Sequence, residues 1–227
     1  MDSSGLGCPG EPEAGIFPGM KSLPSEDEVR EDLGDKVMEG FSYAVDHTRA
    51  DLAEYRGIRP DWVSQHSERG LANWLHDRLW QHLIVALDPL PEVHVTDGGV
   101  TRELTVGHRY RLRAKRHDEA GMVQTYPTQT ALAFMLQRPE EPTFEGFEEV
   151  RLLVGYAWDR ETRNVGAGLL SLRADREKII WQIELPPSQS GGIAPPVGTP
   201  LPPTQPQAPE IQVGEGDEEQ NSGAGSA

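Results

Sequence analysis

The sequence predicts an α+β protein, in which an N-terminal helical hairpin packs with an antiparallel or mixed sheet of about five strands and one further helix. Between residues 25 and 87 apolar side chains recur every three or four positions, which is the spacing of amphipathic helices. From Glu92 the spacing changes to two, as in strands with one buried face, and helical spacing returns only near residue 130. Helices followed by a block of strands are typical of the α+β class.

The first helix is expected to begin after Ser25. Ser25 and Glu28 form a capping box, because the hydroxyl and the carboxylate can each bind a free backbone N–H group of the first turn. The helix should end at Arg56-Gly57, since glycine readily adopts the left-handed conformation that closes a helix. One apolar stripe connects the two ends: Val29, Leu33, Val37, Phe41, Ala44, Thr48, Leu52 and Tyr55.

A second helical pattern runs from Pro60 to Leu87 and stops at Asp88-Pro89, because the residue before a proline disfavours the helical conformation. We expect a break or cap between Ser67 and Gly70. The short Gly/Pro connection between the two helical segments predicts that they form an antiparallel hairpin.

The strand-forming part opens with a predicted β-hairpin. Residues 92–96 and 100–104 flank Asp97-Gly98-Gly99, and Asp-Gly supplies the positive φ angles of a type I′ turn. Gly107 is expected to form a bulge before a strand at 108–117. The remaining elements are a helix at about 127–137, with Ala131, Leu132, Met135 and Leu136 on one face, an acidic loop at 138–149, and strands at 151–158, 165–173 and 178–185.

Composition divides the chain into a folded core and two tails. Residues 1–24 hold few periodic apolar positions, and residues 187–227 are rich in proline and glycine, with five acidic and no basic side chains. Such segments bury too little apolar surface to offset the entropy lost on folding. We therefore expect a single domain at 25–186 between disordered tails at 1–24 and 187–227.

Simple counts exclude several classes of protein. No apolar run approaches the roughly 20 residues of a membrane-spanning helix, and no basic stretch followed by an apolar one opens the chain as in a secretory signal. The single cysteine, Cys8, excludes an internal disulfide and a multi-cysteine metal site. We expect a cytoplasmic protein with no membrane contact.

The charge excludes a protein that coats DNA. The net charge is −16, and residues 26–186 hold 29 acidic and 20 basic side chains, whereas phosphate neutralisation needs clustered Lys and Arg. No phosphate-binding loop, dinucleotide fingerprint or serine-hydrolase elbow is present. We predict no catalytic residue, no cofactor and no metal site.

One segment, residues 108–117, concentrates positive charge. Side chains alternate across a strand, so Tyr110, Leu112 and Ala114 are expected on one face. The opposite face then carries a row of four cations: Arg109, Arg111, Arg113 and Lys115. Such a row is repulsive unless acidic side chains or an anionic ligand screen it.

Two interpretations of this row remain open. It can pair with Glu103, with Glu184 or with the acidic loop at 140–149. Alternatively it binds a phosphate, a nucleotide, a nucleic acid or an acidic protein, and the anion site then also includes His117 and Thr128, because Thr128 stands at the entry of the predicted helix, where N–H groups are free.

Two features of the second helix bear on function. His76-Asp77 resembles the metal-binding dipeptide of HD-type phosphohydrolases, which would imply a metal-dependent hydrolase, but no second His-Asp motif follows it. A nuclease acid-x-Lys motif also fails, because Arg113 stands two residues before Lys115. Trp80 lies beside the stripe that Leu79 and Leu83 define, and an exposed Trp on a helix would indicate a protein interface.

These observations favour a non-enzymatic cytosolic accessory or regulatory protein that acts by binding a protein partner. The alternative is a nucleic-acid or nucleotide-binding protein that uses the Arg-rich strand at 108–117. A metal-dependent hydrolase built from scattered residues is the third hypothesis.

Overall fold

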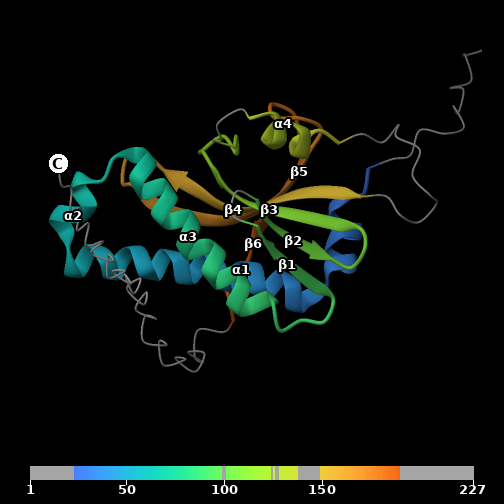
Figure 1. The fold of residues 1–227 in the computed structure, drawn as a ribbon, viewed down its shortest axis with the longest axis horizontal. Coiled ribbons are helices and arrows are strands. Elements are labelled where there is room, and N and C mark those ends of the chain that lie inside the picture. Colours follow the sequence, from blue (N-terminus) through green and yellow to red (C-terminus); the bar gives the residue numbers. More distant parts are fainter. Residues whose placement is uncertain (1–22, 99–100, 124, 126–127, 138–148, 190–227) are drawn as a thin grey trace, which may run out of the picture. The chain divides into compact units, whose positions relative to one another are not determined.

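The computed structural model describes residues 23–98, 101–123, 125, 128–137 and 149–189. The predicted tails at 1–24 and 187–227 and the acidic loop lie almost entirely outside these residues. Four helices are described: α1 (Glu26–Ile58), α2 (Pro60–Gln65), α3 (Glu68–Leu87) and α4 (Gln129–Met135). The strands are β1 (Val93–Asp97), β2 (Arg102–Val106), β3 (Tyr110–His117), β4 (Val150–Asp159), β5 (Asn164–Arg173) and β6 (Ile179–Leu185), so the α+β class is confirmed (Figure 1).

The capping box forms as predicted and starts α1. The Ser25 N–H donates to Oε2 of Glu28 at 2.7 Å, and the Glu28 N–H donates to Oγ of Ser25 at 3.3 Å. Gly34 has a φ of +74°, which kinks the helix near its start. Beyond the kink the predicted stripe of α1 is buried as far as Leu52.

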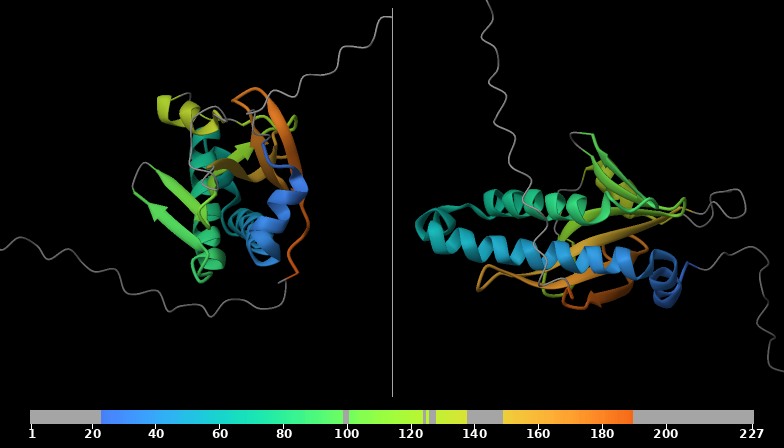
Figure 2. Two further views of the ribbon diagram at one scale, coloured as in Figure 1. Left: turned by 90° about the vertical axis from the view of Figure 1, so that its right-hand side faces the viewer. Right: turned by 90° about the horizontal axis from the view of Figure 1, so that it is seen from below.

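The second helical pattern divides where a break was expected. α2 ends at Gln65, and Ser67 caps α3 by accepting a hydrogen bond from the Gly70 N–H at 3.0 Å. His66, between the two helices, contacts the Tyr55 hydroxyl at 3.0 Å. α3 then runs back along α1, which gives the predicted helical hairpin (Figure 2, right).

The sheet has six strands in the order β1-β2-β3-β4-β5-β6, one more than expected. β3 and β4 are parallel, with α4 in the connection between them, and every other neighbouring pair is antiparallel. The predicted bulge at Gly107 is wrong: with a φ of +58°, Gly107 instead starts a tight turn that joins β2 to β3. The type I′ turn is also wrong, because Gly98 is not in the left-handed region.

The two faces of the sheet have different cores. α1 and α3 cover one face and form the main core with alternate residues of β3 and β4, such as Leu112 and Val154. α4 lies on the opposite face, where Phe134 and Met135 pack with Leu153. The face predicted for this helix included Leu136, which is exposed because α4 ends at Met135. Among the described residues, no helix has the length and apolar character needed to cross a bilayer.

The β1–β2 hairpin separates from the rest of the sheet. Pairing of β2 with β3 stops at Leu104–Leu112, whereas β1 and β2 stay paired as far as Asp97–Arg102. The free end of the hairpin therefore stands apart from β3 (Figure 2, left). It is anchored to α3 instead, where the Trp80 indole N–H donates to Oδ2 of Asp97 at 3.0 Å. Trp80 is only 2% exposed, so the exposed position that an interface role would need is not observed.

Candidate anion-binding site

The structure divides the predicted row of cations. Arg109 precedes β3, and its Nη1 donates to Oδ2 of Asp32 on α1 at 2.7 Å. Arg111, Arg113 and Lys115 share the face of β3 opposite its fully buried side chains, as the alternation predicts. Arg113 lies over the Phe134 ring of α4, with its Cζ 4.1 Å from the ring centroid. The row therefore begins at Arg111, and Arg109 is not part of it.

Glu103 forms ion pairs with the first two members of the row, Arg111 and Arg113. Its carboxylate is held by both arginines: Nε and Nη2 of Arg111 donate to Oε2, and the same atoms of Arg113 donate to Oε1. Glu103 is 5% exposed. Burial by itself would raise the pKa of this carboxyl, but the hydrogen bonds and charges of the two arginines hold the pKa below its usual value.

The ion-pair network continues across the parallel strands. Glu149, the last residue of the predicted acidic loop, accepts from Nη1 of Arg111 at 3.0 Å and from Nε of Arg151 at 2.6 Å. Glu184, the third expected partner, lies on β6 opposite Leu169, three strands away from β3. Arg111 and Arg113 thus have carboxylate partners inside the fold.

His117 and Thr128 do not join the row. His117 is fully buried, its Nε2 lies 3.4 Å from Oγ of Ser171, and burial followed by the charge of Arg173 lowers its pKa to about 4. Thr128 caps α4, where its Oγ1 accepts from the Ala131 N–H at 3.1 Å. The six residues of the predicted anion site are therefore not brought together in one place, although two of them, Arg113 and Lys115, line a common pocket.

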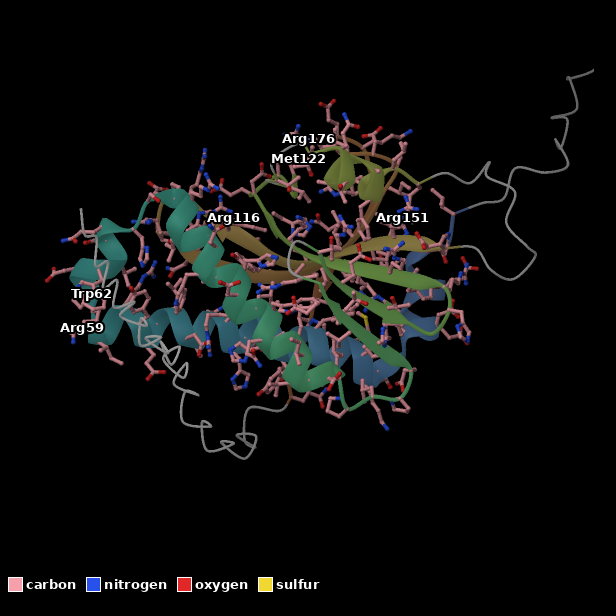
Figure 3. All side chains as sticks on the ribbon, viewed as in Figure 1. Arg59, Trp62, Arg116, Met122, Arg151 and Arg176 are labelled. Carbon is pink, nitrogen blue, oxygen red and sulfur yellow. The ribbon has the colours of Figure 1, made fainter. Side chains whose placement is uncertain are left out.

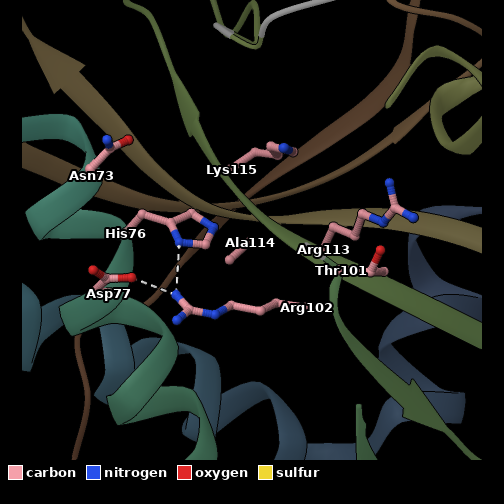
Figure 4. A pocket seen from close by; sticks show the side chains of 8 residues that line it. All are labelled: Asn73, His76, Asp77, Thr101, Arg102, Arg113, Ala114 and Lys115. Atoms are coloured by element: carbon pink, nitrogen blue, oxygen red, sulfur yellow. Dashed lines mark hydrogen bonds and ion pairs between the residues drawn. The ribbon is translucent and has the colours of Figure 1, made fainter. Parts of the chain in front are cut away.

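That pocket opens where β2 leaves β3. It has a volume of about 380 Å³ and lies between the hairpin, β3 and α3 (Figure 4). Its lining comes from α3 (Asn73, His76 and Asp77), from the start of β2 (Thr101 and Arg102) and from β3 (Arg113, Ala114 and Lys115). The early end of the β2–β3 pairing thus produces a concave, polar site.

Lys115 is the unusual member of the lining. Its Nζ lies 3.4 Å from Oγ1 of Thr125, and within the described ranges no carboxylate pairs with it. Burial, followed by the nearby charge of Arg113, lowers the pKa of this ammonium group. Lys115 is thus a largely buried cation whose counter-ion is missing from the part of the chain that the structure describes.

Arg102 and His76 form the opposite wall. Nη1 of Arg102 donates to Oδ1 of Asp77 at 2.5 Å and lies 3.4 Å from Nδ1 of His76. Burial, followed by the charges of Lys115 and Arg102, lowers the pKa of His76, although a hydrogen bond to the Ala114 backbone opposes the shift. His76 is therefore neutral at pH 7 and adds no charge to the pocket.

Sequence reasoning found part of this site and missed the rest. His76 and Asp77 were singled out for a different chemistry, and Asn73, Thr101 and Arg102 were not considered as site residues. A usable signal was the spacing of Asn73, His76 and Asp77, which places them on one face of a helix. Across the described residues, no three His, Cys, Asp or Glu side chains come together in a way that could hold a metal ion.

A second feature lies at the far end of the helical hairpin. Ile58 and Trp62, where α1 meets α2, are 63% and 57% exposed. The guanidinium of Arg59 lies over the Trp62 ring, 4.9 Å from its centroid (Figure 3). This exposed apolar pair, rather than Trp80, has the character of a protein contact.

Comparison with known proteins gives no relative: no family model, no curated protein and no solved structure matches this chain.

Proposed function

We propose that this chain binds a small molecule through an anionic group, held in the pocket between α3, β2 and β3. The observation that carries the proposal is Lys115, a largely buried ammonium group at the pocket wall with no carboxylate partner among the described residues. An uncompensated buried charge costs several kcal/mol in a folded protein. An anionic ligand would supply the missing partner and would recover part of that cost on binding.

The surrounding groups support the same ligand class. Arg102 and Arg113 place two further guanidinium groups at the wall, and each is also tied to a carboxylate, Asp77 or Glu103. These ion pairs hold the arginines in position. A phosphate or carboxylate group matches such a set of donors.

A small molecule fits this site better than a nucleic acid. The pocket volume falls within the roughly 300–1,000 Å³ that small-molecule sites span. A nucleic-acid backbone needs several free cations along a surface, whereas Arg111 and Arg113 are both committed to Glu103. Nucleotide binding remains within the proposal, because a nucleotide is a small anionic ligand.

Calorimetric titration of the full chain tests this function. The probes are inorganic phosphate, adenosine monophosphate and a single-stranded RNA oligonucleotide, at low ionic strength. We expect at least one of the two small anions to bind, the binding to be lost in Lys115→Met, and Lys178→Met to behave as the unmodified chain, because Lys178 is exposed on another part of the surface. Binding of the RNA with equal loss in both variants, or no anion binding at all, would overturn the proposal.

A protein-binding role is a second candidate, favoured by the exposure of Ile58 and Trp62 at the end of the helical hairpin. Aromatic anchors contribute much of the binding energy in protein interfaces. Such a contact is compatible with an accessory or regulatory protein that reports the occupancy of the anion pocket.

A further inference from the structure

Lys115 differs chemically from a cation that only attracts an anion. A lysine becomes a nucleophile when its amine loses the proton, and burial next to another cation favours the neutral amine. Both conditions are met here, since Lys115 is largely buried and the Arg113 charge lies close to it. Each unit by which a lysine pKa falls raises its unprotonated fraction about tenfold at neutral pH.

The pocket gives this amine room and two groups that can orient a substrate. Lys115 lines about 380 Å³ of open space, with Arg113 beside it on β3 and Arg102 across from it on β2 (Figure 4). Nη1 of Arg113 has a 3.4 Å contact with the Thr130 carbonyl, while Nε and Nη2 of the same guanidinium are bound to Glu103. An anion attracted into this cationic lining would bring the rest of its molecule close to the Lys115 amine.

His76 adds a group that can move a proton. It is neutral, it lines the same pocket, and the Lys115 charge is close enough to lower its pKa. Its Nδ1 lies 3.4 Å from Nη1 of Arg102. A neutral imidazole beside an amine can accept and return protons during addition to a carbonyl group.

We propose that Lys115 captures a small anionic aldehyde or ketone in this pocket as a reversible Schiff base. The proposal rests on the proposed function, because the anion site holds the carbonyl compound in place. It goes further by naming the carbonyl group as the second feature of the ligand.

The chemistry balances without a further reagent. The Lys115 nitrogen attacks the carbonyl carbon, the C=O π bond breaks, and a proton moves from nitrogen to oxygen to give a carbinolamine. The hydroxyl then leaves as water after protonation while nitrogen forms the double bond and loses its second proton. His76, which lines the same pocket, or solvent water can carry these protons, and hydrolysis by the reverse steps releases the ligand.

Reductive trapping on the full chain tests the proposal. Cyanoborohydride delivers hydride to an imine carbon and fixes the adduct as a secondary amine. The probes are glyoxylate, which carries a carboxylate, and glycolaldehyde, which has a similar size but no charge. The chain has only four lysines, Lys21, Lys36, Lys115 and Lys178, so peptide mapping resolves each site.

We expect glyoxylate to label Lys115 several-fold faster than Lys178, because burial and Arg113 lower the pKa of Lys115 and the cationic pocket attracts the carboxylate. Glycolaldehyde should show a much smaller preference, and inorganic phosphate should slow the labelling of Lys115 by glyoxylate. Labelling of Lys115 by glyoxylate no faster than that of Lys178 would overturn the Schiff-base proposal.

The variant Lys115→Arg keeps the positive charge and removes the nucleophilic amine. We expect it to lose the trapped adduct at residue 115, with the labelling of Lys178 unchanged. Calorimetry on the unmodified chain separates this inference from the proposed function. If the unmodified chain binds anions but shows no preferred labelling, only the Schiff-base inference fails. If it binds no anion, the proposed function fails with it.

Discussion

Glu103 and Arg113 form a two-point ion pair in which Nε and Nη2 of one guanidinium donate to a single carboxylate oxygen, with Nε 2.8 Å from Oε1. The second oxygen is left for Arg111, which binds it in the same way. One carboxylate thus makes a row of like charges tolerable on adjacent positions of the β3 face. The pairing also leaves Lys115, two residues further along, as the member of the row without such a partner in the described chain.

Replacing Glu103 with glutamine should destabilise the fold by about 3 kcal/mol, because removing one member of a buried ion pair leaves the other charges uncompensated. Urea unfolding at pH 7 measures the change. Glu184→Gln is the matched control, since Glu184 is exposed on β6 and surface substitutions usually change stability by less than about 0.5 kcal/mol. Equal effects of the two substitutions would show that the Glu103 pairs contribute little.

Replacing Lys115 with methionine should stabilise the ligand-free protein. The substitution removes a largely buried charge and keeps a flexible chain of similar length, so we expect a gain of about 1 kcal/mol and a rise in Tm of roughly 2–4 °C. Differential scanning calorimetry measures it, with Lys178→Met as the exposed control. A lower Tm would indicate that the Lys115 charge is compensated in the fold.

His117 should make the fold sensitive to acid. The pKa of His117 is lowered to about 4 in the folded chain, whereas a histidine in an unfolded chain has a pKa near 6.5. Between these values the unfolded state binds a proton that the folded state does not bind. The free energy of unfolding is therefore unaffected by the titration of His117 above about pH 6.5. It decreases by up to about 3 kcal/mol as the pH falls toward 4.

The change in unfolding free energy between pH 7.5 and 5 measures this contribution. We expect His117→Leu to lose less stability over this range than the unmodified chain, because the residue no longer titrates. His94→Gln is the control, since His94 is exposed. Identical pH profiles for His117→Leu and the unmodified chain would mean that His117 titrates normally in the folded state.

The exposed pair at the end of the helical hairpin gives a prediction for protein binding. Trp62→Glu should abolish recovery of a partner protein by affinity capture. The introduced carboxylate would lose its water in the complex without gaining a partner, and the aromatic anchor would be gone. Val85→Glu on α3 is a control of similar character, since Val85 is 39% exposed. Partner recovery that is unchanged in Trp62→Glu would exclude this surface as the contact.

Local patterns in the sequence predicted most of the secondary structure. The capping box at Ser25 and the strand-forming residues at 151–158 each gave an element close to its observed position, because both depend on residues near in sequence. The turn at Gly107 was misread because bulges and tight turns share the same glycine conformation. The turn at Gly107 separates β2 from β3 and leaves Arg109 outside the cationic row.

The site itself depended on contacts that periodicity does not encode. Trp80 lies beside the buried stripe of α3, as predicted. The side chain of Trp80 is nevertheless buried, and its indole N–H donates to the hairpin residue Asp97. The pocket exists because β2 stops pairing with β3 after Leu112. The position at which two strands stop pairing depends on tertiary packing. Alternation on β3 did predict that Arg113 and Lys115 share a face, and Glu103 was named beforehand among the acidic side chains that could pair with the row.

The central claim is that Lys115 lacks a carboxylate partner among the described residues and that a ligand anion supplies one. NMR titration of the lysine side-chain Cε and Nζ signals tests it directly, because the chain has only four lysines and Lys178 provides an exposed reference. We predict that the pKa of Lys115 lies below the ordinary value of a lysine side chain in the free protein, because of burial and Arg113, and rises when inorganic phosphate or adenosine monophosphate is added. A Lys115 pKa at the ordinary lysine value, unchanged by both anions, would contradict the claim.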